Sequence, residues 1–226
     1  PNSKPFYDDW ALVISKASKF FIVSDIPKNV LIIRYNFQDS EWADSMIKTK
    51  LKTTDYEWLT ASWNEKTNPA KNNCNDKPEP TCIGSRQKLL PSGTSLILEG
   101  IPSKLGWDDP TIEFRYRGGV LESHELMHSF QTNAMLGKDG AWPPHWMMEG
   151  AAEYLGSSMT LSASFDDFAL FRKQEATQLF QTAKFNNSNP SDEKFILDYL
   201  NSTFNEYGNY DRMYSYNLGF FIMESL

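Results

Sequence analysis

The chain has 226 residues, of which 40% are hydrophobic and 14% aromatic. This composition favours a folded protein with one substantial core and argues against an intrinsically disordered chain. The formal net charge of −7, without any basic run or stripe, argues against a nucleic-acid partner. Because no apolar run approaches the roughly 20 residues that a membrane helix needs, we predict no membrane span.

The first half of the chain carries a mixture of helix and strand patterns. Apolar spacing predicts a helix over residues 6–19, and a second helix is expected at 42–50. Runs of β-branched and aromatic residues predict strands at 20–23 and at Asn29–Asn36, separated by the turn sequence SDIPKN.

Residues 64–92 are rich in Asn, Lys, Pro and Asp, so we expect a long loop or insertion there. Strand patterns return at 95–99 (SLILE) and at 111–117 (TIEFRYR), where apolar and polar residues alternate as in a half-exposed strand. After Gly118 and Gly119 the patterns are nearly all helical. The predicted helices cover residues 120–135, 145–157, 165–180, 192–200 and 210–226.

This order of elements predicts an α+β fold in a single domain over residues 1–226, with a sheet-containing lobe at 1–118 and a mainly helical lobe at 119–226. The chain begins at Pro1 without an initiator methionine or a signal-peptide pattern, and it stops inside the apolar run GFFIMESL. We therefore expect a fragment or a processed chain, truncated at one or both ends.

Two cysteines, Cys74 and Cys82, lie in the loop sequence NNCNDKPEPTC, without a further Cys or His at metal-ligand spacing. We favour a short disulfide between them over two free thiols, and a disulfide indicates an exported protein. Glycosylation sequons at Asn186 and Asn201 are compatible with export, although such triplets are also common by chance. A secreted or periplasmic location is therefore expected.

The stretch SHELMHSF carries two of the three histidines of the chain. On a helix, residues four apart lie on one face, so the imidazoles of His124 and His128 can reach one zinc ion. Glu125 lies on a neighbouring face, where it can hold a water molecule and take its proton without binding the metal. An exposed His–Glu–His run on a surface helix gives the same pattern, so the motif needs a third ligand.

The downstream sequence PHWMMEGAAEYLG offers that ligand in Glu149. Pro143 and Pro144 open a second helix, which can pack so that Glu149 faces the two histidines. Glu153, one turn later, can accept the free N–H of a ligand histidine and so fix the orientation of its ring. His145 could in principle join the metal, but its place at the helix start favours a structural or solvent-exposed role.

The motifs HELMH and WMMEGAAEY, within residues 121–156, resemble the gluzincin metallopeptidases, in particular the aminopeptidase-N-like and bacterial peptidase-MA-like groups. The resemblance implies a zincin-like fold with a zinc site in the cleft between a sheet lobe and a helical lobe. It implies Zn²⁺ bound by His124, His128 and Glu149. Glu125 would then be the general base in the hydrolysis of a peptide or protein substrate.

The C-terminal run YSYNLGFF resembles the Yxx(G/S)xxF helix of peptidase-MA-like proteins, which points to Tyr216 as the group that stabilises the oxyanion, with Tyr214 as the fallback. A half-buried core tyrosine explains the same pattern. Gluzincins place an edge strand for substrate at the position of residues 111–117. This segment contains Glu113 but not the pattern of aminopeptidases, Gly-(Ala or any residue)-Met-Glu-Asn, which leaves an endopeptidase or an unusual specificity open.

Two other functions stay open at the level of the sequence. Zinc could stabilise a non-catalytic binding domain, although structural zinc sites are closed and usually rich in cysteine. The same constellation could also hydrolyse a bond other than a peptide bond. An open metal position that solvent can reach would distinguish a catalytic site from a structural one.

Overall fold

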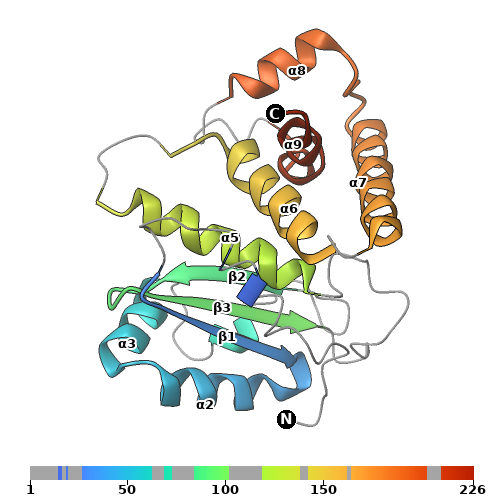
Figure 1. Cartoon of the computed structure of the whole chain (residues 1–226). Helices are drawn as coiled ribbons and strands as arrows, with labels where there is room; N and C mark the ends of the chain where they lie inside the picture. The colour runs from blue at the N-terminus through green and yellow to red at the C-terminus, as the bar shows by residue number, and fades with distance from the viewer. Residues whose placement is uncertain are drawn as a thin grey trace. The chain divides into compact units, whose positions relative to one another are not determined.

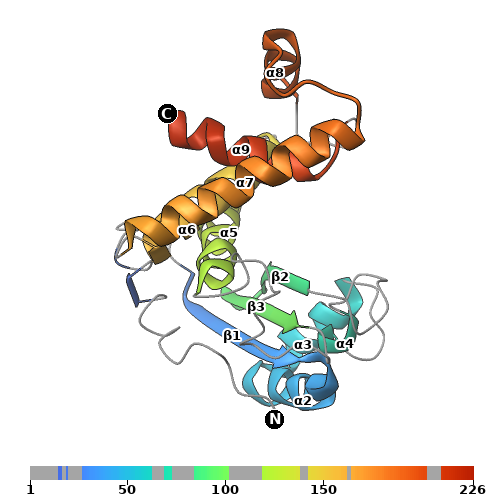
Figure 2. The ribbon, with the colours of Figure 1, turned by 90° about the vertical axis from the view of Figure 1, so that its right-hand side faces the viewer.

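A computed structural model describes the chain over residues 15, 16, 19, 27–62, 69–72, 84–101, 119–137, 142–161, 164–202 and 210–226. These residues form an α+β structure with a three-stranded sheet and a majority of helices (Figures 1 and 2). The chain divides into two compact units, which we call the sheet unit (Pro1–Ala134) and the helical unit (Met135–Leu226). From the sequence we placed the lobe boundary after residue 118, whereas this division falls after Ala134.

The described part of the sheet unit combines three strands with short helices. Its elements are β1 (Asn29–Asn36), the 3₁₀ helix η1 (Phe37–Asp39), α2 (Ser40–Lys50), α3 (Thr53–Ser62), α4 (Pro69–Asn72), β2 (Gly84–Leu89), β3 (Thr94–Ile101) and α5 (Val120–Met135). The strand predicted at Asn29–Asn36 is confirmed, and the segment 95–99 lies within β3. The helix predicted at 42–50 lies within α2, whereas α3 was not predicted.

The expectation of a long loop over residues 64–92 is wrong in part, because β2 lies inside it. This strand is antiparallel to β3, and Gly93 makes the turn between them with a φ of +83°. Among the residues that the structure describes, β2 pairs with β3 alone, in the sheet order β1-β3-β2, and polar residues such as Arg86 and Lys88 are tolerated in a strand at such a position. Because strands were predicted from runs of apolar residues, this polar strand was not predicted.

The central strand β3 separates an apolar face of the sheet from a polar one. Leu96 and Leu98 are buried in a core formed with side chains of β1, α2, α3 and α4. Alternation along the strand turns Ser95 and Glu99 to the opposite face. Figure 1 shows α2 and α3 on one face of the sheet and α5 on the other. The helix that carries the HELMH motif therefore rests on the polar face.

The described part of the helical unit consists of α6 (His145–Leu161), α7 (Phe165–Phe185), α8 (Glu193–Leu200) and α9 (Met213–Ser225), close to the predicted helices. Helix α6 packs across α9 at the point where Gly150 and Gly219 meet. A Cβ added to Gly150 would lie 2.4 Å from the carbonyl carbon of Gly219. Only two glycines allow the backbones to come so close, and this contact fixes the neighbouring Glu149 relative to α9.

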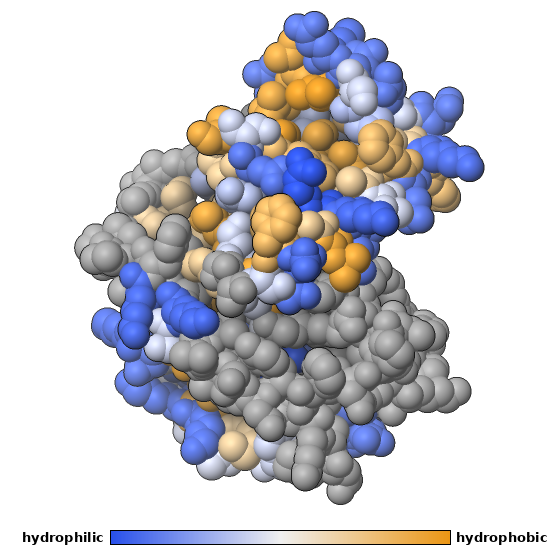
Figure 3. Space-filling view, turned by 45° about the vertical axis from the view of Figure 1, so that its right-hand side comes forward, coloured by the Kyte–Doolittle hydropathy of each residue, from blue (hydrophilic) through white to orange (hydrophobic). Residues whose placement is uncertain are grey.

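Aromatic side chains fill the core of the helical unit around Trp146, Tyr199 and Tyr214. The outer surface of α7 and α8 mixes charged side chains with exposed apolar ones, as the orange and blue atoms in Figure 3 illustrate. The exposed apolar residues on these two helices are Phe165, Leu170, Phe180, Phe185 and Leu197. None of the helices in the described ranges is long and apolar enough to cross a membrane.

Several predictions concern residues outside the described ranges. These are the strands at 20–23 and 111–117, the glutamate Glu113, the cysteines Cys74 and Cys82, and most of the helix at 6–19, of which residues 15, 16 and 19 are helical. They stay predictions.

Candidate metal site

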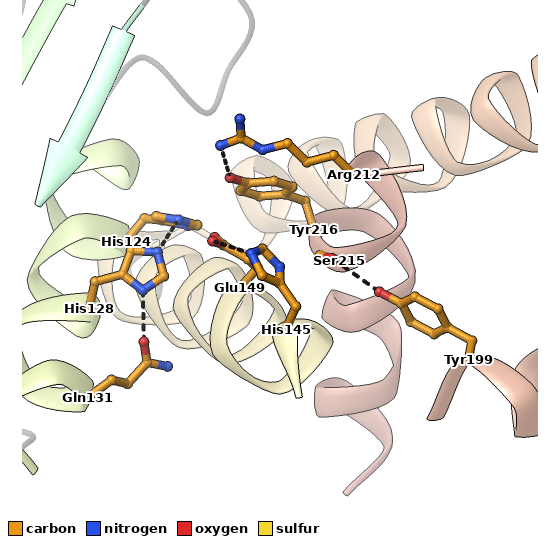
Figure 4. A network of polar contacts seen from close by, with 9 residues as sticks. All are labelled: His124, His128, Gln131, His145, Glu149, Tyr199, Arg212, Ser215 and Tyr216. Carbon is orange, nitrogen blue, oxygen red and sulfur yellow. Dashed lines mark hydrogen bonds and ion pairs between the residues drawn. The ribbon is translucent and has the colours of Figure 1, made fainter. Parts of the chain in front are cut away.

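The two histidines of the HELMH motif converge on α5. Their Nε2 atoms lie 3.0 Å apart, and the rings meet edge to face with centroids separated by 4.7 Å (Figure 4). The second ring nitrogen of His128, Nδ1, lies 2.8 Å from Oε1 of Gln131. An amide oxygen only accepts hydrogen bonds, so this contact places the proton of His128 on Nδ1 and leaves Nε2 as a lone-pair donor. Nε2 of His128 is thus suited to bind a metal ion, and Nε2 of His124 lies beside it.

Polar side chains hold α5 on the sheet. The Ser95 hydroxyl of β3 donates to Ser129 Oγ at 2.7 Å, and the Ser129 hydroxyl donates to the backbone oxygen of Glu125 at 3.1 Å. Gln87 of β2 donates to Ser95 Oγ at 2.8 Å and to Thr132 Oγ1 at 3.3 Å. Because these hydrogen bonds are directional, they fix the rotation of α5 and with it the direction in which the histidines project.

A buried charge cluster lies near the start of the same helix. Arg34 of β1 forms ion pairs with Glu99 of β3 at 3.2 Å and with Glu122 of α5. The three side chains are at most 9% exposed. Burial, the charge of Glu122 and the charge of Glu125 raise the pKa of Glu99 well above its ordinary value, and Arg34 opposes this rise in pKa. Glu125 itself is buried, so the predicted base has this cluster in its electrostatic surroundings.

The carboxylate predicted as third ligand lies on α6. Glu149 has a side chain that is 13% exposed, and its Oε1 lies 3.8 Å from Nε2 of His145, one helical turn earlier (Figure 4). His145 is 16% exposed, which supports the structural alternative for this residue over the solvent-exposed one. Glu153, one turn beyond Glu149 on the same helix, is fully buried.

The two candidate tyrosines of α9 have different surroundings. Tyr214 is buried in the aromatic core, and its hydroxyl contacts Ser188 Oγ, which favours a packing role. Tyr216 is half-buried, and its phenolic oxygen accepts a hydrogen bond from Arg212 Nη2 at 3.0 Å. Because Tyr214 is held in the aromatic core, Tyr216 with its cationic neighbour Arg212 is better suited than Tyr214 to act on a substrate.

The predicted site residues are shared between the two units. His124, Glu125 and His128 belong to the sheet unit. The structure brings the two histidines together there and, within the helical unit, brings Glu149 against His145. Glu149, Glu153 and Tyr216 belong to the helical unit.

Sequence reasoning missed Gln131, Arg212 and the cluster of Arg34, Glu99 and Glu122. The cluster did leave a signal, because Arg34 and Glu99 each interrupt an otherwise apolar strand with charges of opposite sign. Two such strands that pair in parallel bring the charges side by side, as the register of Arg34 with Glu99 shows.

The donor types fit a catalytic zinc ion, because two imidazole nitrogens and one carboxylate oxygen form a recurrent ligand set of zinc hydrolases. Comparison with known protein families, with curated proteins and with solved structures finds no match. The functional assignment therefore rests on the residues themselves.

Proposed function

We propose that the protein is a zinc-dependent peptidase of gluzincin type, in which His124, His128 and Glu149 bind one Zn²⁺ ion and Glu125 is the general base. The observation that carries this proposal is the convergence of the two Nε2 atoms at 3.0 Å, with Gln131 against Nδ1 of His128. A pair of exposed surface histidines would not need this arrangement, and His124 is buried.

Zinc bound by these residues would supply Lewis-acid activation of a water molecule. Glu125 takes a proton from the attacking water and passes it to the nitrogen of the leaving amine. Tyr216 donates its phenolic O–H to the oxygen on which negative charge develops, and the cation of Arg212 beside it favours that charge. The role that the resemblance suggests for Glu153 is to accept an N–H of a ligand histidine, which would fix the orientation of that ring.

The substrate class follows from the resemblance to gluzincins and is a peptide or a protein. Cleavage within a chain is favoured over removal of an N-terminal residue, because the sequence lacks the pattern Gly-(Ala or any residue)-Met-Glu-Asn, whose glutamate binds a substrate amine in aminopeptidases. The pair Cys74 and Cys82 supports action outside the cytoplasm, in a secreted or periplasmic protein.

The Glu125→Gln variant tests the proposed role of the base. It should keep the zinc ion and lose peptide cleavage by about 10²- to 10⁴-fold, because the amide cannot take a proton from water. Cleavage is measured on a library of fluorogenic peptides with and without a chelator, and bound zinc by elemental analysis. Glu193→Gln is the matched control, since Glu193 is an exposed carboxylate on α8 and its loss should change neither quantity.

Two results would count against the proposal. Full activity of Glu125→Gln would remove Glu125 from the mechanism, and cleavage that a chelator does not inhibit would remove the metal. Zinc binding by a wild-type protein that cleaves none of the peptides would instead favour a zinc-stabilised binding domain or a non-peptide substrate.

A further inference from the structure

The third histidine of the chain lies against the proposed carboxylate ligand. His145 opens α6, and its Nε2 atom lies 3.8 Å from Oε1 of Glu149 (Figure 4). Both side chains are mostly buried, at 16% and 13% exposure, so water screens this contact only weakly. Residues that are four apart on a helix are neighbours, but exposed neighbours of this kind rarely hold each other in place. The burial of His145 and Glu149 distinguishes this pair from such exposed pairs.

The backbone under the pair is fixed at several points. The carbonyl oxygen of Pro144 accepts hydrogen bonds from the amides of Met147 at 2.9 Å and Met148 at 3.2 Å, which closes the first turn of α6. The indole N–H of Trp146 donates to the backbone oxygen of Leu200 at 3.2 Å. The contact between Gly150 and Gly219 fixes the helix just beyond Glu149. The backbone positions from which His145 and Glu149 project are therefore fixed by the packing of α6 itself.

A carboxylate has two oxygens and can bind a metal through one or through both. A catalytic zinc ion with three protein ligands keeps a position open for water or substrate, and a second oxygen from the glutamate would fill it. A hydrogen bond from an imidazole to one oxygen withdraws that oxygen from the metal. The distance of 3.8 Å is longer than a hydrogen bond, and contacts of this kind often shorten only when the site is loaded.

We propose that His145 is a positioning residue, whose Nε2–H group holds Oε1 of Glu149 so that Glu149 binds the metal through its other oxygen alone. This inference rests on the proposed function, since it takes Glu149 as a metal ligand. It assigns to His145 neither a place among the ligands nor contact with the substrate. The position that a catalytic metal needs for water or substrate would then stay unfilled by Glu149.

The test uses the full chain loaded with Co²⁺, whose visible absorption is intense in four-coordinate sites and weak in six-coordinate ones. In His145→Ala, both oxygens of Glu149 are free to bind, so the absorption should weaken and the Kd for Co²⁺ should rise by about 10-fold. His145→Gln keeps an N–H donor and should restore both quantities towards wild type. His145→Phe keeps the bulk without the donor and should behave like His145→Ala, with circular dichroism showing that each variant is folded.

The outcomes separate this inference from the proposed function. Wild-type absorption and affinity in His145→Ala, together with Co²⁺ binding by the wild type, would overturn the positioning role and leave the proposed function standing. Complete loss of Co²⁺ in both His145→Ala and His145→Gln would make His145 a ligand, which also overturns the role. A wild-type chain that binds no Co²⁺ and no Zn²⁺ would overturn both proposals.

Discussion

The two helices that carry the proposed zinc ligands are held in their units by opposite means. Helix α5, with the two histidines, lies on the sheet through hydrogen bonds and buried charges, from Ser95 to Ser129 and from Arg34 to Glu122. Helix α6, with Glu149, is held by close packing of its backbone on α9. Polar contacts fix the rotation of a helix, whereas backbone packing fixes its distance from a neighbour.

This difference predicts that each helix is sensitive to a different kind of substitution. On the α5 side, removing one charge should be costly, because the remaining charges stay buried without compensation. On the α6 side, adding a single methyl group at the glycine contact should be costly, because it forces two backbones apart.

Arg34→Met should reduce the free energy of unfolding by about 3–5 kcal/mol, because Glu99 and Glu122 would stay buried without their cation. Urea denaturation followed by circular dichroism measures the change. Lys194→Met is the matched control, since Lys194 pairs with Asp198 on the exposed surface of α8 and its loss should leave stability unchanged within error. Equal effects of the two substitutions would show that the buried cluster does not hold the sheet unit together.

Gly150→Ala should cost about 1–3 kcal/mol, because the new Cβ would overlap the backbone of Gly219 and force α6 and α9 apart. Thermal unfolding gives the loss of stability. Gly219→Ala meets the same contact from the other side, with its Cβ at 2.7 Å from the backbone oxygen of Trp146. Once the helices have separated, the second substitution adds little, so additive losses in the double variant would contradict a shared contact.

Glu99→Gln should have the smallest effect, and one that depends on pH. Burial and the charge of Glu122 raise the pKa of Glu99 in the folded state, so the folded protein keeps its proton to a higher pH than the unfolded chain does. The stabilisation is complete below the ordinary pKa of 4.5 and is lost as the pH rises through the raised pKa. A glutamine has no proton to lose, so Glu99→Gln should gain stability relative to wild type as the pH increases.

Urea denaturation of both proteins from about pH 4 to about pH 8 tests this prediction. A constant difference in stability over the range would mean that Glu99 does not hold a proton in the folded state. The substitution keeps the shape of the side chain, so packing does not obscure the comparison.

The helices of the second half could be predicted because local signals mark them. Apolar spacing and the proline pair Pro143 and Pro144 predict α6. Asp192 caps the start of α8, where its side chain accepts a hydrogen bond from the amide of Phe195. The strand β2 could not be predicted, because it is stabilised by pairing with β3 and not by apolar residues of its own. The backbone hydrogen bonds to β3, and not the side chains of β2, make this segment a strand.

Some parts of the candidate site could likewise be predicted from the sequence, and others could not. The spacing of His124 and His128 follows from helix geometry, so the convergence of their rings could be predicted. Gln131 could be placed on the same helix, but its contact with His128 could not be predicted, because a glutamine three residues further along a helix can also face solvent or other partners. The cluster of Arg34 with Glu122 joins residues far apart in the chain, and only the fold brings them together.

We propose above that His124, His128 and Glu149 bind one zinc ion. Isothermal titration of the metal-free protein with Zn²⁺ tests it most directly, with Glu149→Ala beside wild type and Glu193→Ala as the control for loss of an exposed carboxylate. We predict one zinc ion per chain in wild type and control, and a Kd raised by more than about 100-fold in Glu149→Ala, since a ligand should matter more than the partner of a ligand. Equal zinc affinity in Glu149→Ala and wild type would show that Glu149 is not a zinc ligand.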